Sequence, residues 1–106
     1  MIEFTPSRVG LDRANVFTGD GDIPVGPAGA HSLMLLDGAS NTVTATLPSV
    51  SLCISQTYTI KCIEASFQCG FIAKVPDNVD GSAALINLGL NEAKTVRSDG
   101  LDWWVI

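Results

Sequence analysis

The chain has 106 residues, of which 46% are hydrophobic and 16% are charged, and its formal net charge is −5. This length predicts one domain with a modest core, and the high apolar share excludes a disordered chain. The six basic residues are scattered along an acidic chain, which excludes a nucleic-acid-binding protein. No segment approaches the roughly 20 consecutive apolar residues that cross a bilayer, and the first residues do not resemble a leader peptide. We therefore expect synthesis in a cytoplasm and no contact with membranes.

Residues 1–31 are predicted to form an extended N-terminal arm. Gly, Pro and Asp dominate residues 18–30, and this composition is too poor in large apolar side chains to build a packed unit. The apolar side chains of the arm lack a helical period, so they gain order mainly by lying along another surface. These contact residues are Ile2, Phe4, Val9, Leu11, Val16 and Phe17. The arm either clasps a neighbouring molecule or packs as edge strands on its own domain, and both interpretations stay open.

Residues 32–106 are predicted to form a β-domain. Short runs rich in β-branched and apolar residues follow one another at the spacing that is typical of a sandwich or barrel, and no amphipathic helix interrupts them. The expected strands are 32–36, 42–47, 57–64, 71–75, 84–88, 94–97 and 103–106. Asp-Gly pairs at 80–81 and 99–100 predict tight turns between them. The fold class is therefore all-β, a small antiparallel sandwich or jelly-roll-like domain whose strand order the spacing does not determine.

Two adjacent tryptophans lie in the last predicted strand. Successive residues of a strand point to opposite faces, so one ring can enter the core while the other needs a second covering surface. Each buried Trp removes on the order of 150 to 250 Å² from water, which makes an uncovered ring costly. We expect an interface between copies of the chain formed by Trp103, Trp104, Val105 and Ile106. Which ring lies in the core is left open.

The sequence predicts neither an enzyme nor a metal or cofactor site. The single histidine, His31, is not part of a recognisable nucleophile motif. Residues 20–22 are similar to the start of a calcium loop, but His31 occupies the position of the bidentate Glu, which excludes an EF-hand. A looser calcium site between subunits stays an alternative. The odd number of thiols favours reduced, core-filling cysteines over a disulfide between two of them on neighbouring hairpin strands; they are Cys53, Cys62 and Cys69.

Several short segments of the β-domain resemble a known module. In chain order they are Thr46-Leu47-Pro48, Tyr58-Thr59-Ile60-Lys61, Val79-Asp80-Gly81, residues 84–88, residues 93–100 and Trp103-Trp104-Val105-Ile106. Together they resemble the repeating β-module of bacteriophage structural proteins, which occurs in tail fibres, head fibres and capsid decoration proteins. The resemblance covers residues 42–106 and implies a small β-domain that trimerises about its long axis. Residues 1–41 lie outside it.

Three functions are compatible with these features. The favoured one is a trimeric capsid decoration or cement protein, made in the host cytoplasm and located on the capsid surface, whose arms contact the major capsid protein. The second is a short head or tail fibre, or its base, whose loops 37–41 and 76–78 contact a host-surface glycan. The third is a monomeric carbohydrate-binding sandwich in which Trp103 and Trp104 form an exposed stacking platform. A trimer that binds capsids distinguishes the first from the others.

Overall fold

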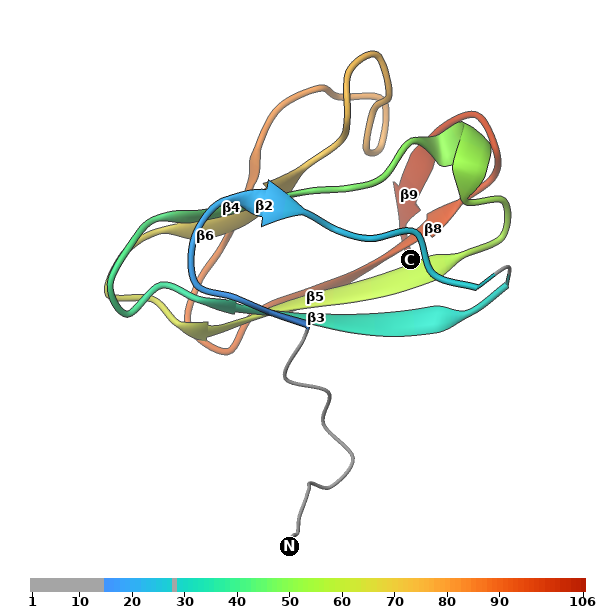
Figure 1. The fold of residues 1–106 in the computed structure, drawn as a ribbon. Helices are drawn as coiled ribbons and strands as arrows, with labels where there is room; N and C mark the ends of the chain where they lie inside the picture. The colour runs from blue at the N-terminus through green and yellow to red at the C-terminus, as the bar shows by residue number, and fades with distance from the viewer. Residues whose placement is uncertain (1–14, 28) are drawn as a thin grey trace, which may run out of the picture.

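Two β-sheets pack face to face around one core in the computed structural model, which describes residues 15–27 and 29–106 (Figure 1). The five-stranded sheet has the order β1-β3-β5-β8-β9, with β1 (Val16–Phe17), β3 (His31–Asp37), β5 (Thr57–Glu64), β8 (Ala93–Ser98) and β9 (Trp103–Val105). The four-stranded sheet has the order β2-β4-β6-β7, with β2 (Gly21–Asp22), β4 (Val43–Thr46), β6 (Cys69–Ile72) and β7 (Ile86–Leu88). One 3-10 turn, η2 (Val50–Leu52), lies between β4 and β5.

The all-β prediction is confirmed, but the predicted strand direction is wrong. From β1 to β6 the chain alternates between the two sheets, so β1 pairs in parallel with β3, β3 with β5, β2 with β4 and β4 with β6. Only β5/β8, β8/β9 and β6/β7 are antiparallel. The sheets are therefore mixed, and neither an antiparallel sandwich nor a jelly roll describes them. Strand spacing alone does not tell a hairpin from a turn that carries the chain to the opposite sheet, which is why the direction was missed.

The alternation between sheets gives the first half of the fold a repeated unit of two strands. His31 of β3 pairs with Thr57 of β5, and Val43 of β4 pairs with Cys69 of β6, so both pairs are 26 residues apart (31 to 57 and 43 to 69). The chain therefore takes the same number of residues, 26, to pass from a strand to its parallel partner in each sheet. A single extra residue in β5 opposite the end of β3 is absorbed as a bulge.

Most predicted strands lie where expected, and β6 is the exception. It covers Cys69–Ile72 instead of 71–75, because the chain turns after Ala73, with the Asp77 amide donating to the Lys74 carbonyl. Val75 consequently points into solvent, with 87% of its surface exposed. Cys69 and Gly70, which precede the predicted strand, belong to β6, and both are buried.

Part of the predicted arm belongs to the β-domain. Val16 and Phe17 form β1 and Gly21–Asp22 form β2, each at the edge of its sheet, and Ile23 is buried in the core. For these residues the edge-strand interpretation holds. The arm residues Ile2, Phe4, Val9 and Leu11 lie outside the described residues.

The core is built from the inward-facing side chains of both sheets. The five-stranded sheet contributes Met34, Leu36, Ile60, Cys62, Val96 and Trp103, and the four-stranded sheet contributes Val43, Ala45, Phe71 and Leu88. Trp103 is completely buried, and its ring meets the edge of Tyr58 at a centroid distance of 5.6 Å and an interplanar angle of 66°. Its Nε1 donates to the carbonyl of Pro48 at 3.3 Å. Of the two adjacent tryptophans, Trp103 is therefore the core residue.

A buried polar network ties the Gly/Pro-rich segment to β5. The hydroxyl of Tyr58 donates to the Pro24 carbonyl and accepts from the Gly26 amide, both at 3.0 Å. The Gln56 amide nitrogen, 3% exposed as a residue, donates to the carbonyls of Gly26 and Pro27. Because these buried groups find partners in the segment, a sequence poor in apolar side chains is still held against the domain.

The free edge of β9 is also occupied. The Asp80 amide donates to the Trp103 carbonyl at 2.9 Å, and the Trp103 amide donates to the Asn78 carbonyl at 3.0 Å. One carboxylate oxygen of Asp80 accepts from the Val105 amide at 2.9 Å. The predicted Asp80-Gly81 turn, with both residues at positive φ, thus covers a strand edge that would otherwise present unpaired backbone groups.

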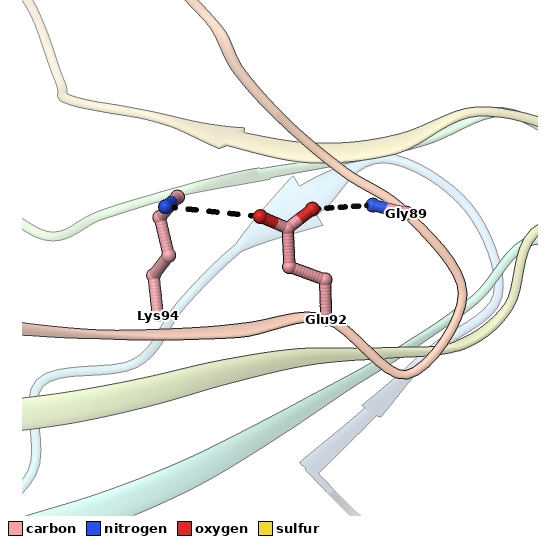
Figure 2. A network of polar contacts seen from close by, with 3 residues as sticks. All are labelled: Gly89, Glu92 and Lys94. Carbon is pink, nitrogen blue, oxygen red and sulfur yellow. Dashed lines mark hydrogen bonds and ion pairs between the residues drawn. The ribbon is translucent and has the colours of Figure 1, made fainter.

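The chain returns from the four-stranded to the five-stranded sheet through the loop between β7 and β8. Figure 2 shows how Glu92 fixes this loop: one carboxylate oxygen accepts from the Gly89 amide at 2.8 Å, and the other lies 3.7 Å from Lys94 Nζ. Asn91 has a φ of 63°, and its amide donates to the Cys62 carbonyl of β5. The loop is thereby fastened to the central strand of the five-stranded sheet.

Candidate interaction surface

The candidate catalytic side chains, His31 and the cysteines, contact other residues of the fold. His31 begins β3, and its Nε2 lies 2.7 Å from Oγ1 of Thr59. The three cysteines are free and buried. Burial, followed by a hydrogen bond to Cys62, raises the pKa of the Cys69 thiol to about 11, and burial also raises the pKa of Cys53. These two thiols are therefore protonated at neutral pH and are poor nucleophiles.

Cys62 and Cys69 are not on neighbouring strands of a hairpin, as one interpretation held. They belong to opposite sheets, and their sulfur atoms approach the same carbonyl oxygen of Glu64, at 3.4 Å and 3.3 Å. The two thiols fill the core between the sheets at this end of the domain.

Acidic residues do not gather into a metal site in the described part of the chain. No group of three or more His, Cys, Asp or Glu side chains occurs there. Asp20, singled out in the sequence, accepts a hydrogen bond from the Thr44 amide at 2.9 Å and so anchors β4. It lines a shallow cavity of about 320 Å³ with Asp22, Thr44 and Thr46 on the outer side of the four-stranded sheet. None of the described helical segments is long and apolar enough to cross a membrane.

The outer side of the five-stranded sheet is a regular surface that four longer strands and the edge strand β1 build. Because Met34, Ile60, Val96 and Trp103 point inward, the residues between them point outward. We call this surface the β3–β5–β8 face, and it consists of His31, Leu33, Leu35, Thr57, Thr59, Lys61, Ala93, Thr95, Arg97, Trp104 and Ile106. The strand register arranges them in rows, and one row runs Leu33, Thr59, Thr95. Ile106 lies at the end of that row, since its amide donates to the Thr95 carbonyl.

The polar groups in the middle of this face satisfy one another. Thr59 Oγ1 lies 2.7 Å from His31 Nε2 and 2.9 Å from Thr95 Oγ1. The chain of hydrogen bonds spans three adjacent strands. The face therefore presents few unpaired donors or acceptors at its centre.

The charge distribution over the two outer sides differs. Of the 11 carboxylate residues, Glu3 and Asp12 precede the described residues, and none of the others is a member of the β3–β5–β8 face. On that face, Lys61 pairs with Ala93 in one outer row and Arg97 pairs with Thr57 in the other. On the outer side of the four-stranded sheet, Asp22 pairs in register with Thr46. Carboxylates are therefore absent from the middle of this face, and Asp99 lies at its corner beside Trp104.

One corner of the β3–β5–β8 face is hollowed and carries two exposed apolar side chains. Trp104 is 43% exposed and Ile106 is 70% exposed. They line a cavity of about 330 Å³ together with Ser55, Arg97, Ser98 and Asp99. The exposed side chains of Ile54 and Leu101 lie beside this corner, since a Cβ added to Gly100 would stand 3.6 Å from Ile54.

Asp99 fixes the Trp104 ring at this corner. Indole Nε1 donates to one carboxylate oxygen of Asp99 at 2.9 Å, and the other oxygen accepts from the amides of Leu101 and Asp102, both at 2.8 Å. The two backbone donors, and then the indole, lower the pKa of this carboxyl group. The Trp104 ring is therefore oriented by a hydrogen bond to the ionised Asp99 carboxylate.

The four residues predicted to form an interface are split by the fold. Trp103 lies in the core and Val105 packs against it, whereas Trp104 and Ile106 are exposed. A platform of two exposed tryptophans is therefore wrong, because only one ring reaches solvent. Sequence analysis missed Arg97 as the cross-strand neighbour of Trp104, and it missed Leu33 and Thr95 as members of the same face. The alternation within 57–64 did place Thr57, Thr59 and Lys61 on one side, but only the register shows which other strands share it.

Comparison of the chain with protein-family models, with curated proteins and with solved structures found no match. The chemistry of the surface is therefore the basis for assigning a function.

Proposed function

We propose that this protein is a non-enzymatic structural component of a bacteriophage particle, a homotrimer that decorates the capsid by binding the major capsid protein. The proposal starts from the resemblance of residues 42–106 to phage β-modules. The observation that carries it is the split of the adjacent tryptophans: the Trp103 ring completes the core, whereas Trp104 is 43% exposed and Ile106 is 70% exposed on the outer side of the five-stranded sheet.

An exposed apolar corner favours an assembling protein over a free monomer. Contiguous apolar patches on soluble proteins mark interaction sites, and burial of apolar surface contributes about 25 cal/mol per Å². Trp104, Ile106, Ile54 and Leu101 supply such a patch next to a cavity. Covering it with a second copy removes it from water.

The arm supplies the second contact in this proposal. Val16 and Phe17 fasten the base of the arm to the edge of the five-stranded sheet through their pairing with Leu35 and Leu36. The apolar residues before them, Ile2, Phe4, Val9 and Leu11, are the side chains proposed to contact the major capsid protein or a neighbouring subunit.

The test combines two measurements on the full chain. Light scattering gives the mass in solution, and co-sedimentation with capsids that lack this protein gives binding. A species of three copies that pellets with capsids supports the proposal. A monomer that stays in the supernatant refutes it. Capsids that gain no resistance to heat or dilution on binding refute the cementing role.

A short fibre or fibre base that contacts a host surface is the second candidate. One observation favours it: the cavity of about 330 Å³ places the half-exposed Trp104 ring beside Arg97 and Ser55. An indole face and a guanidinium group suit the apolar and hydroxyl-bearing sides of a sugar ring. Retention of the trimer on host polysaccharide, without binding to capsids, selects this candidate.

A further inference from the structure

We propose that Cys62 and Cys69 are an oxidation site, at which the folded chain closes a disulfide between its two sheets after it has left the host cytoplasm. The timing rests on the proposed function, because a chain on the surface of a particle leaves the reducing compartment in which it is made. The bond joins β5 of the five-stranded sheet to β6 of the four-stranded sheet.

The fold brings the two sulfur atoms together at one end of the core. The loop that joins β5 to β6 is only residues 65–68, so the two strands converge there, although stacked sheets ordinarily lie about 10 Å apart. Sγ of Cys62 lies 3.4 Å, and Sγ of Cys69 3.3 Å, from the carbonyl oxygen of Glu64. The Cys69 thiol also forms a hydrogen bond with the Cys62 thiol. Both residues are completely buried, so each sulfur has the other as its neighbouring thiol.

Backbone pairing already holds both cysteines in place. The Cys62 amide donates to the Glu92 carbonyl at 3.0 Å. Cys69 is paired on both sides, with Val43 of β4 and with Leu88 of β7. Because the two backbones are fixed in the folded chain, closing the bond costs little additional conformational entropy.

Loss of the two thiol protons does not leave the Glu64 carbonyl without a partner. Its oxygen also accepts a hydrogen bond from the Gly38 amide at 2.8 Å. A thiol is a weak donor, whereas an amide is a strong one, and the amide stays. The carbonyl that both thiols face therefore remains satisfied after the disulfide forms, and the cost of an unpaired buried acceptor is avoided.

The third cysteine has a different neighbour. Cys53 is also free and buried, but its thiol forms a hydrogen bond with Tyr58. Tyr58 precedes Cys62 by four positions in β5, and four positions of a strand span about 13 Å. Oxidation between neighbouring thiols therefore joins Cys62 to Cys69 and leaves Cys53 reduced, which agrees with an odd number of cysteines.

A hydroperoxide supplies the oxidising equivalents. The thiolate of one cysteine attacks the O–O bond of hydrogen peroxide, which leaves a sulfenic acid and, after protonation, one water. The other cysteine loses its thiol proton, and its sulfur displaces the sulfenic oxygen as a second water while the S–S bond forms. The two thiols lose two electrons and two protons, and the peroxide becomes two waters. The raised pKa of Cys69 keeps its thiolate scarce, so closure is slow at neutral pH.

The exposed loop 65–68 lies beside the thiols and is the shortest way to them. The Phe67 carbonyl oxygen lies 3.9 Å from Cys69 Sγ, and the Phe67 amide donates to the Gly38 carbonyl at 2.7 Å. Hydrogen peroxide is little larger than water, so a local opening of this loop admits it. A bulky thiol reagent needs a wider opening.

The experiment treats the folded, reduced, full-length chain with hydrogen peroxide at pH 8 and then alkylates the remaining thiols in urea. Trypsin cuts after Lys61 and Lys74 and releases both cysteines in the fragment 62–74. We expect this fragment to lose two hydrogen atoms and to carry no alkyl group, while Cys53 is alkylated. After a second cut behind Phe67, we expect the two cysteine-containing pieces to separate only on reduction, since the S–S bond holds them together.

Cys53→Ala is the matched control, because it removes a buried cysteine from another part of the core. This variant is expected to form the bond, whereas Cys62→Ala and Cys69→Ala are expected to form none. Circular dichroism checks that each chain is folded during the treatment. A bond that includes Cys53, a bond between two chains, a sulfinic acid in place of the bond, or a bond that forms only in urea overturns the inference.

Two measurements on the unmodified chain complete the test. Cells lysed directly into urea with the alkylating reagent are expected to yield a chain alkylated at all three cysteines, and a bond already present there overturns the proposed timing. Closing residues 62–69 is expected to raise the midpoint of urea unfolding by about 1 M, reversibly with dithiothreitol. An unchanged midpoint means that the bond does not fit the fold and overturns the inference.

Failure of this inference is distinguishable from failure of the proposed function. A reduced chain that forms no bond but still pellets with capsids keeps the proposed function and loses the oxidation site. A chain that closes the bond but stays in the supernatant in both thiol states loses the proposed function, and with it the proposed timing.

Discussion

Replacing Trp103 by Ala is expected to remove a large fraction of the stability of the fold. The ring is completely buried, meets Tyr58 edge to face and donates a hydrogen bond to Pro48. Truncation of a buried Trp to Ala costs about 3–5 kcal/mol, whereas the whole free energy of unfolding of a typical domain is about 5–15 kcal/mol. The variant therefore lies close to the limit of folding.

Trp104→Ala is the matched control one residue later. This ring is 43% exposed, and its loss removes mainly the hydrogen bond to Asp99. Surface changes of this kind cost at most about 1 kcal/mol. Trp103→Phe keeps an aromatic ring against Tyr58 but loses the hydrogen bond, so it is expected to fall between the two, at about 1–2 kcal/mol.

Urea unfolding followed by circular dichroism measures these differences. With a slope of about 2 kcal/mol per M urea, a loss of 4 kcal/mol lowers the midpoint by about 2 M. The titrations are run at a concentration where the protein is monomeric, because assembly adds stability by mass action. Equal midpoints for Trp103→Ala and Trp104→Ala would mean that the assignment of the two rings to core and surface is wrong.

Three further predictions concern other parts of the domain. Gly70→Ala is expected to lower the free energy of unfolding by about 1–3 kcal/mol, because the added Cβ would lie 2.5 Å from a backbone oxygen of β7, whereas Gly89→Ala, with its nearest neighbour at 3.7 Å, serves as the near-neutral control in thermal melts. Asp99 has a folded pKa below its ordinary 3.8, so its contribution to stability is complete above that pH and disappears as the pH falls through the folded pKa. The midpoint difference between the native chain and Asp99→Asn should therefore be present at pH 6 and shrink as the pH is lowered below 3.8; a difference that does not shrink on acidification contradicts the role of the ionised carboxylate. Cys69, with a pKa of about 11, should react with a thiol reagent at pH 8 only after unfolding, and rapid labelling of the native protein would disprove its burial.

The strands were largely predictable because their signal is local. The alternation in 57–64 coincides with β5, and the Asp-Gly pairs lie at turns, where Gly81 and Gly100 have φ values of 79° and 91°. Runs of β-branched residues between such turns carry this information in themselves. The observed β6 begins two residues before the predicted 71–75 and includes Gly70. Gly70 is a strand residue whose lack of a side chain lets a neighbouring backbone approach.

The pairing of strands and the composition of the surface could not be predicted from such local signals. Whether β3 pairs with β5 or with β4 depends on contacts between residues far apart in the chain. The residues around His31 and Thr57 contain no local sequence signal that they pair. The edge strands β1 and β2 have only two residues each and little apolar content, so their order comes from the sheets they join. The same limit applied to the candidate interface. Trp104 was visible in the sequence, but its cross-strand neighbour Arg97 was not.

The alternation of the chain between two sheets also has a consequence for the rate of folding. Each parallel pair joins segments about one full turn of the chain apart, such as 31 with 57, so no strand from β1 to β6 can pair with its immediate successor. The entropy of closing these loops must be spent before their contacts form, and folds rich in such distant contacts typically fold in milliseconds to seconds. Trp103, which fills the centre of the core, comes from the last strand of all. A chain in which β9 is undocked leaves the part of the core that Trp103 fills open to water, and such exposed apolar surface promotes aggregation.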